Sequence, residues 1–175
     1  SGGSLVVPTI SSTSTTIAPV EMSVVGSVLN MSGGTIVIQS EGGTGANELG
    51  LVASEGTLNV TGGTLQIGNA STPVTQTISI NSTVPFPSLV VNSANATARL
   101  TANLSILNNV TISAGILNTN GFNLSLGGNW SNSGTYTPTA GTVTFNGTGT
   151  QTITKSTTET FYNLIVNKGS GVVDL

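Results

Sequence analysis

An internal repeat is the feature that most constrains what this chain can fold into. The segment from Gln76 to Asn92 returns as the segment from Gln151 to Asn167, and 8 of the 17 aligned positions are identical. Self-similarity at a fixed spacing is typical of folds in which one supersecondary unit stacks on the next, because a single unit cannot bury its apolar face alone. The repeat therefore predicts a stack of similar units.

A shorter period lies inside the longer one. Three segments share one sequence frame, and the first two are twice as far apart as the last two: 58–69, 110–121 and 136–147. An earlier copy places Gly34 at the position that Gly63 holds in the frame. The basic coil is therefore predicted to have about 26 residues, with three coils approximating the superrepeat and about six coils in the chain.

The local pattern predicts strands. Alternating or β-branched runs of four or five residues are bounded by Gly or Asn, as at 77–80, 109–112, 123–126, 142–145 and 163–166. No segment carries apolar residues at helical spacing over ten positions. The fold class is therefore predicted to be all-β.

Two all-β architectures remain open, and we predict a right-handed parallel β-solenoid (β-helix) over a β-sandwich. A coil of about 26 residues holds three short strands and three turns. A sandwich would pair its strands through hairpins, for which Asn120-Gly121 and Asn146-Gly147 are signals, although the same residues suit left-handed corners of a solenoid. Antiparallel pairing between the strands around Leu65 and Ile78 would refute the solenoid.

In a solenoid, inward residues of successive coils stack in ladders about 4.8 Å apart. The repeat frame predicts one ladder through Leu65, Leu117 and Val143 and another through Ile67 and Phe145. It also predicts a single corner at which three glycines stack: Gly63, Gly115 and Gly141. The aromatic residues Phe86, Phe122, Trp130, Tyr136 and Phe161 are predicted to fill the core at wider corners.

The chain divides into two parts. Residues 1–20 form a linker or atypical entry segment, in which Pro8 and Pro19 bracket a Ser/Thr-rich run. Residues 21–175 form the β-solenoid repeat domain, with the superrepeat at 76–92 and 151–167. Because the sequence stops within a superrepeat, we expect Leu175 to be followed by more coil or to be covered by another subunit.

Composition argues against several classes of function. Only 5% of residues are charged, the net charge is −3, and Arg99, Lys155 and Lys168 stand singly, so no nucleic-acid partner is predicted. No apolar run reaches the length of a membrane span. The chain has no Cys, which excludes a disulfide framework or a thiolate site. No cofactor is predicted.

An enzyme is not predicted, although β-helices host glycosidases and lyases. Glycoside hydrolysis needs a pair of carboxylates, yet residues 56–158 contain no acidic side chain, and the chain has no His. No catalytic residues are therefore assigned.

One acidic cluster is the candidate metal site. Glu41, Glu48 and Glu55 surround the glycine-rich loop at 42–47, and their oxygens are ligands that suit calcium. The glycine-aspartate nonapeptide of calcium-binding β-rolls is missing, so a solvated acidic loop is expected instead. Removal of calcium is predicted to leave stability unchanged.

Asparagine and threonine form two further patterns. Ten Asn-x-Ser/Thr sequons occur, several of them in predicted strands, where asparagine ladders compete with glycosylation; they start at Asn30, Asn59, Asn69, Asn81, Asn95, Asn103, Asn109, Asn123, Asn129 and Asn146. Thr142 and Thr144 form a Thr-x-Thr pair like those of ice-binding solenoids. One coil earlier the equivalent positions are Ile116 and Asn118, so ice binding is not predicted.

Three segments of the sequence resemble a known family, at 126–136, 141–153 and 161–168. They resemble the Thr/Asn/Gly-rich repeats of very large secreted cell-surface adhesins of Bacteroidetes-type bacteria, including gliding-motility adhesins and haemagglutinin-like repeat proteins. The resemblance covers about residues 56–175. It implies an elongated β-solenoid displayed outside the cell, and it supplies no catalytic residues.

The predicted function is a structural or adhesive rod segment of an extracellular adhesin or filament. Its partners would be neighbouring repeats or identical subunits, with surface polysaccharide as a further candidate. The alternatives are a self-assembling fibre or pilus subunit, a carbohydrate-binding β-helix module and a degraded lyase. Sugar binding would need exposed aromatic rings, for which Trp130, Tyr136 and Tyr162 are the candidates.

Overall fold

The chain is built from short parallel strands. The computed structural model describes residues 3–8, 18–22, 24–42, 47–52 and 56–175, and no helix occurs among them. Every strand pairing in this part of the chain is parallel. The strands are β1 Ser4–Val7, β2 Val20–Met22, β3 Ser27–Ile38, β4 Leu49–Leu51, β5 Gly56–Ile67, β6 Gln76–Ser82, β7 Ser88–Leu100, β8 Leu104–Ile106, β9 Val110–Asn118, β10 Leu124–Leu126, β11 Trp130–Asn132, β12 Thr135–Thr137, β13 Thr142–Phe145, β14 Gln151–Lys155, β15 Asn163–Val166 and β16 Val173–Asp174.

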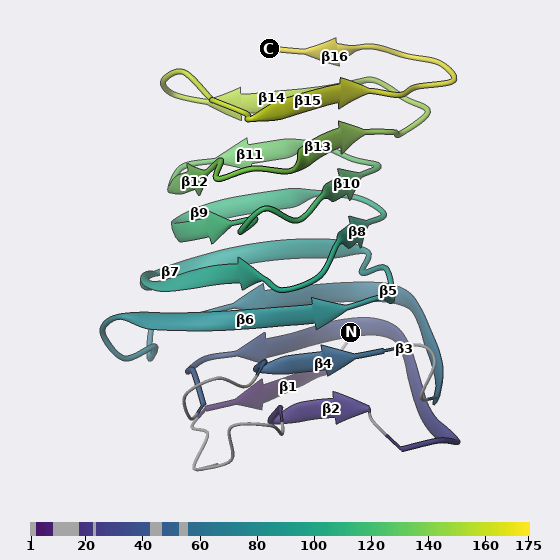
Figure 1. The fold of residues 1–175 in the computed structure, drawn as a ribbon, viewed down its shortest axis with the longest axis vertical. Helices are drawn as coiled ribbons and strands as arrows, with labels where there is room; N and C mark the ends of the chain where they lie inside the picture. The colour runs from purple at the N-terminus through teal and green to yellow at the C-terminus, as the bar shows by residue number, and fades with distance from the viewer. Residues whose placement is uncertain (1–2, 9–17, 23, 43–46, 53–55) are drawn as a thin grey trace.

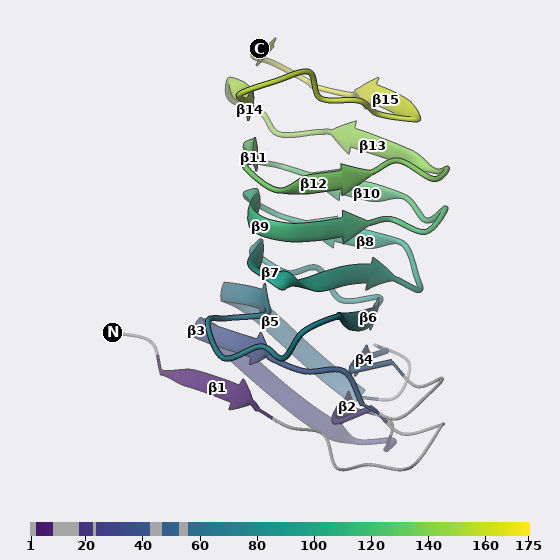
Figure 2. The ribbon, with the colours of Figure 1, turned by 90° about the vertical axis from the view of Figure 1, so that its left-hand side faces the viewer.

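The strands lie on three faces of one stack (Figure 1; Figure 2). The long face runs through β1, β3, β5, β7, β9, β11, β14 and β16. The middle face joins β2, β4 and β6 to the second halves of β7 and β9, and ends at β12. The short face is a separate sheet in the order β15, β13, β10 and β8. From β7 to β14 the chain visits the long, middle and short faces in turn and then returns to the long face.

Four strands bend from one face to the next. In β3 and β5 the register shifts between Met31 and Thr35, and in β7 and β9 it shifts between Val91 and Thr97. An irregularity of this kind turns the strand direction locally. These long strands therefore form corners without leaving the sheet.

These observations confirm the all-β prediction and the strands expected at 77–80, 109–112, 123–126, 142–145 and 163–166. The hairpin pairing of a β-sandwich is not found among the described strands: β5 pairs with β3 and β7, and β6 pairs with β4 and β7. Asn120 and Gly121 both have positive φ, of 52° and 87°, which fits a corner. Within the expected entry segment, β1 joins the long face, whereas residues 9–17 lie outside the described residues.

The predicted coil length is wrong at every pairing. Where β1 to β4 pair with later strands, the partners lie further apart in the sequence than predicted, as with Thr35 and Thr64. From β5 onward the partners lie closer together than predicted, as with Leu104 and Leu124. The reason is that the corners differ in length, so similar sequences recur at spacings that are not the spacing of neighbours.

The two predicted ladders are therefore wrong as well. Leu65, Leu117 and Val143 are all buried, but they lie on the long, middle and short faces respectively. Ile67 lies on the long face and Phe145 on the short face. The long-face ladder that contains Leu65 begins at the exposed Leu5 and continues through side chains that are all buried: Ile36, Leu65, Leu89, Val110, Trp130 and Ile153.

The three glycines predicted to share one corner occupy three. All three have positive φ, which favours glycine. A Cβ on Gly63 would meet Gly34, one on Gly115 would meet the carbonyls of Ser93 and Ala96, and one on Gly141 would meet the carbonyl of Phe122. Each glycine thus permits a close backbone approach, but at a different corner.

The two copies of the superrepeat lie on different faces. Gln76–Ser82 forms β6 on the middle face, whereas the matching Gln151–Lys155 forms β14 on the long face. The second half of the repeat lies on the long face in β7 and on the short face in β15. Sequence similarity here marks equivalent strands and turns but not equivalent positions around the stack.

Candidate functional site

The three glutamates considered as candidate metal ligands are not brought together among the described residues, and the acidic loop expected to be solvated is in part buried. Glu55 lies outside the described residues. Glu48 is buried, with 2% exposure, and its carboxylate accepts hydrogen bonds from the backbone N–H groups of Gly42, at 3.1 Å, and Ser79. Glu41 is exposed and accepts from the N–H of Thr77 at 2.5 Å. Across the described ranges, no group of three or more His, Cys, Asp or Glu residues is arranged to hold a metal ion.

Glu48 instead fastens a loop to the middle face. Burial raises the pKa of its carboxyl above the usual value, while the hydrogen bonds from Ser79 and Gly42 oppose the shift and the nearby charge of Glu41 adds to it. Its backbone N–H also donates to the carbonyl of Ser79. The carboxylate oxygens are already used as acceptors, which suits a structural role.

Of the five aromatic residues predicted to fill the core, Phe86, Trp130 and Tyr136 are buried, whereas Phe122 and Phe161 are partly buried and pack against the core. Trp130 and Phe145 are completely buried and Tyr136 is 8% exposed. Trp130 lies edge-on to Tyr136 and to Phe161, with ring centroids 5.0 Å and 5.4 Å apart. Burial removes Trp130 and Tyr136 as platforms for a sugar, whereas Tyr162 is 63% exposed.

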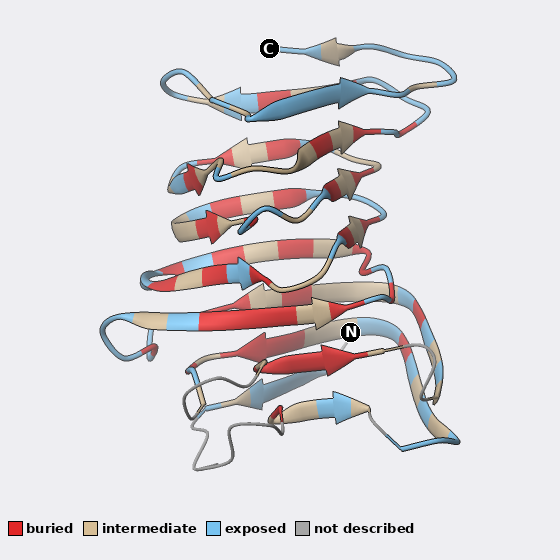
Figure 3. Ribbon diagram, viewed as in Figure 1, coloured by how far each residue is buried: buried red, intermediate tan, exposed pale blue. Residues whose placement is uncertain are grey.

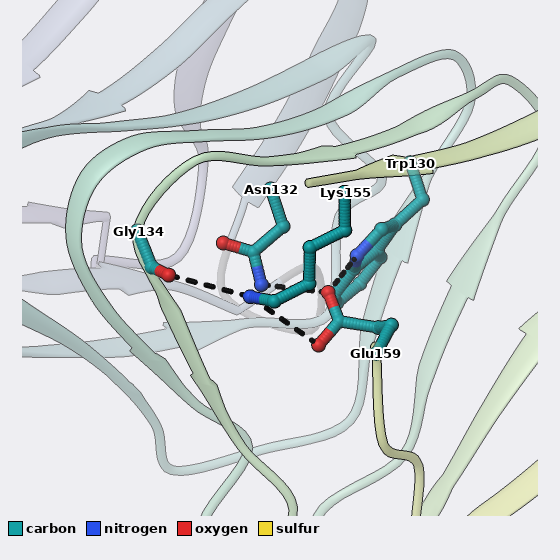
Figure 4. Close-up of polar contacts among 5 residues, drawn as sticks. All are labelled: Trp130, Asn132, Gly134, Lys155 and Glu159. Atoms are coloured by element: carbon teal, nitrogen blue, oxygen red, sulfur yellow. Dashed lines mark hydrogen bonds and ion pairs between the residues drawn. The ribbon is translucent and has the colours of Figure 1, made fainter. Parts of the chain in front are cut away.

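A polar cluster lies against these rings, and sequence reasoning missed it. The carboxylate of Glu159 accepts two hydrogen bonds on Oε2, from Nε1 of Trp130 at 2.7 Å and from Nδ2 of Asn132 at 2.6 Å. Its other oxygen, Oε1, lies 3.8 Å from the amine of Lys155. The side chains of Lys155 and Glu159 are only 15% and 8% exposed. Figure 4 shows the Glu159 carboxylate with its contacts to Trp130, Asn132 and Lys155.

Asn132 and Lys155 occupy positions that are aliphatic in the preceding coils. They are register partners of each other, and the same inward column holds Ile67, Val91 and Ile112 in successive coils. A buried polar or charged side chain costs free energy unless it is fully paired. The usable sequence signal is therefore a polar residue in an aliphatic column, which appears only once the true register replaces the predicted frame.

The pairing in this cluster is incomplete. Asn132 is 2% exposed, yet its Oδ1 finds no hydrogen-bond donor among the described residues. The Lys155 amine has one further contact, to the carbonyl oxygen of Gly134 at 3.4 Å. Burial raises the pKa of the adjacent Tyr136 phenol, against the effect of a hydrogen bond with Thr119, and the negative charge of Glu159 raises it further.

A cavity opens beside the cluster. It has a volume of about 450 Å³ and is lined by Ile153, Lys155, Thr157, Thr158, Glu159, Phe161, Leu164 and Leu175. Its wall combines one amine and one carboxylate with apolar side chains. Solvent can therefore reach the edge of the cluster while its centre stays buried.

Hydroxyl side chains line parts of two outer faces of the stack. Outward residues of the short face follow one another in register as Ser105, Ser125 and Thr144, and Ser125 donates to Ser105 at 3.1 Å. On the long face the outward register is Thr111, Ser131 and Thr154. Hydroxyl groups thus form short columns on two faces.

Comparison with known proteins places the chain in no family. Neither protein-family models, nor curated proteins, nor solved structures match it. No helix among the described residues is long and apolar enough to cross a membrane.

Proposed function

We propose that the chain is a right-handed, closed parallel β-solenoid that serves as a structural or adhesive rod segment of an extracellular surface adhesin or filament. The observation that carries this proposal is the long face, which joins eight strands by parallel hydrogen bonding over an apolar ladder. A continuous ladder of this kind holds distant parts of a chain at a fixed separation. The hydroxyl-rich outer columns would then contact surfaces or neighbouring chains.

Two observations favour this function over sugar binding. Trp130 and Tyr136 are buried and cannot stack on a sugar ring. The outward columns offer small hydroxyl side chains, which contact a flat surface without deep pockets.

The proposal is tested by measuring whether the protein is displayed on the cell surface and whether it contributes to attachment. Fab fragments raised against the folded chain are applied to intact cells of the source organism, and attachment of the cells to a surface is measured. We expect the fragments to label unpermeabilised cells and to reduce attachment, while fragments against a cytoplasmic protein do neither. Labelling that requires permeabilisation would contradict the proposal.

A self-assembling fibre subunit is the second candidate, favoured by the exposure of β15 (Figure 3). Leu164 and Val166 continue the inward register of Val143 and Phe145, yet they are 45% and 54% exposed. Among the described strands, β15 pairs only with β13. An apolar strand with a free edge can pair with another chain.

Light scattering on the purified chain tests this second candidate. Association that disappears in Val166→Lys but persists in Thr148→Lys, an exposed position outside β15, would support it. A monomer at all concentrations would exclude it and leave the rod segment unaffected.

A further inference from the structure

We propose that Lys155 and Asn132 become joined by an intramolecular isopeptide bond, formed by the folded chain itself with Glu159 as the catalytic residue. The bond would link Nζ of Lys155 to Cγ of Asn132 and release ammonia. It would connect β11 to β14, two neighbouring strands of the long face. This inference is independent of the proposed rod function.

The placement of the three side chains is the first argument. Lys155 and Asn132 are direct register partners and face inward, so their side chains share one space. Both side chains reach the same carboxylate, as the dashed lines from Asn132 and Lys155 to Glu159 in Figure 4 show. Neighbouring strands of a sheet lie about 4.8 Å apart, a span that a lysine side chain easily covers. The backbone therefore holds the nucleophile and the acyl group close together. Holding two reacting groups in place in this way can lower the barrier to reaction substantially.

The carboxylate is the second argument, because its two oxygens serve the two ends of the reaction. Oε1 lies 3.8 Å from the amine that must lose a proton, and Oε2 lies 2.6 Å from the nitrogen that must leave. Trp130 holds Oε2 through its indole N–H at 2.7 Å and is a positioning residue. A group within reach of both nucleophile and leaving group can act as general base and then as general acid.

The burial of the cluster is the third argument. The Lys155 amine must lose a proton before it can act as a nucleophile, and the neighbouring Glu159 carboxylate can accept that proton. Oδ1 of Asn132 has no donor in the resting state among the described residues, so the amide forgoes a hydrogen bond that it would otherwise have. Reaction would remove a buried ammonium and replace two buried polar groups by one secondary amide.

The reaction conserves atoms and charge within the chain and its leaving group. Glu159 takes one proton from the Lys155 ammonium, and the nitrogen lone pair attacks Cγ of Asn132. The electron pair of the carbonyl moves to Oδ1, which has no hydrogen-bond partner among the described residues in the resting state. When the carbonyl re-forms, the C–Nδ2 bond breaks, a second proton passes from Nζ to the leaving group, and ammonia departs; it takes up the proton held by Glu159 and diffuses away as ammonium. No oxidant, metal or cofactor is needed.

A second lysine provides a comparison within the same chain. Lys168 also contacts a carboxamide, since its amine donates to Oε1 of Gln151 at 2.6 Å. The Lys168 amine also donates to the carbonyl oxygens of Gly147 and Gly149. The ion pair found among the described residues joins Lys155, not Lys168, to Glu159. Because no carboxylate among the described residues pairs with Lys168, we expect this second lysine to stay unlinked.

Mass spectrometry of the purified full chain tests the inference. We expect the intact mass to fall short of the sequence mass by one ammonia. Trypsin can cleave only after Arg99, Lys155 and Lys168, and a linked Lys155 blocks one of these sites. The expected product is therefore one peptide spanning 100–168 that lacks one ammonia, with fragment ions joining Asn132 to Lys155.

Variants make the test specific. Glu159→Gln keeps an acceptor for Trp130 but cannot take a proton, so it should give the full mass and separate peptides at 100–155 and 156–168. Lys155→Arg should do the same, whereas Thr157→Ala, which alters only the cavity wall, should still link. Trp130→Phe should link more slowly.

Three outcomes would overturn the inference. A wild-type chain of full mass would do so directly, however the variants fold. Loss of ammonia with normal cleavage after Lys155 would instead indicate an asparagine succinimide. A link at Lys168 and Gln151, or a link in Glu159→Gln, would show that the carboxylate is not needed.

Discussion

At the scale of the residue, single atoms decide where the backbone can approach itself. A Cβ on Gly147 would clash with the carbonyl oxygen of Gly127, and the N–H of Gly147 donates to Gln151 at 2.9 Å. At Gly149, further along the same loop, a Cβ would meet nothing within 4 Å. The two glycines form a matched pair, because one is required for packing and the other is not.

We therefore predict that Gly147→Ala lowers the free energy of unfolding by about 1–3 kcal/mol, as expected when a packed site must shift to make room. Gly149→Ala should change it by less than about 0.5 kcal/mol. Urea denaturation of both variants measures the difference. Equal stability of the two would mean that the coils at this corner are further apart than described.

The buried Glu48 predicts a pH dependence. Its pKa in the folded chain is raised above 4.5, so the folded state binds this proton more tightly than the unfolded state does. Its contribution to the free energy of unfolding should therefore fall as the pH rises from the unfolded pKa through the raised folded one, and level off above it. For one proton the slope cannot exceed about 1.4 kcal/mol per pH unit.

Denaturation across the acid and neutral range measures this slope. Glu48→Gln should remove it, although the variant also loses an acceptor for one backbone N–H. Glu21→Gln, at an exposed side chain of β2, should leave it unchanged. A slope of opposite sign that vanishes in Glu48→Gln would contradict the effect of burial.

At the scale of the element, asparagines tie each coil to the next at the ends of the short strands. Oδ1 of Asn103 accepts from the N–H of Asn123, and Oδ1 of Asn123 accepts from the N–H of Thr142, both at 2.9 Å. A second ladder runs from Asn109 to Asn129 and on to Thr152. These asparagines begin four of the sequons, so the sequon pattern there follows from the corner geometry: an amide, then an inward apolar residue, then an outward hydroxyl.

We predict that Asn123→Ala lowers the free energy of unfolding by about 0.5–1.5 kcal/mol, the usual net value of one hydrogen bond. Asn123→Asp keeps the acceptor for Thr142 and should recover most of that loss. Thermal unfolding of the two variants compares them. If both were equally destabilised, the amide group as a whole and not its oxygen would matter.

The strand positions could be predicted from sequence, whereas the register could not. Thr142–Phe145 is recognisable because alternation depends on neighbouring residues alone. The partner of Val143 depends on how many residues the intervening corners hold, and that number changes from coil to coil. The polar cluster around Glu159 could not be predicted for the same reason. Asn132 and Lys155 are recognisable as unusual only when the register shows that they replace isoleucine and valine in a buried column.

At the scale of the whole molecule, each coil gains stability from the coils on both sides. Strands β7, β9 and β11 have partners on either side along the long face, whereas β15 and β1 each pair with one described strand. Repeat stacks of this kind open from positions with fewer neighbours.

We predict that backbone amides of β9 exchange with solvent deuterium most slowly and those of β1 and β15 most rapidly. Hydrogen-exchange mass spectrometry measures this directly. Uniform protection along the chain would instead show that the stack opens in one cooperative step.

The placement of the two superrepeat copies on different faces has a consequence for how such a chain grows. A duplicated stretch of gene need not encode a whole number of turns, since the copy at Gln151 takes up a different side of the stack from the original at Gln76. Recombination can then insert or delete one strand and its turn at a time. Every strand after the change would then lie on a different face of the stack. Related chains would be expected to vary in length by fractions of a turn. A given set of side chains would then move from one face to another without any substitution.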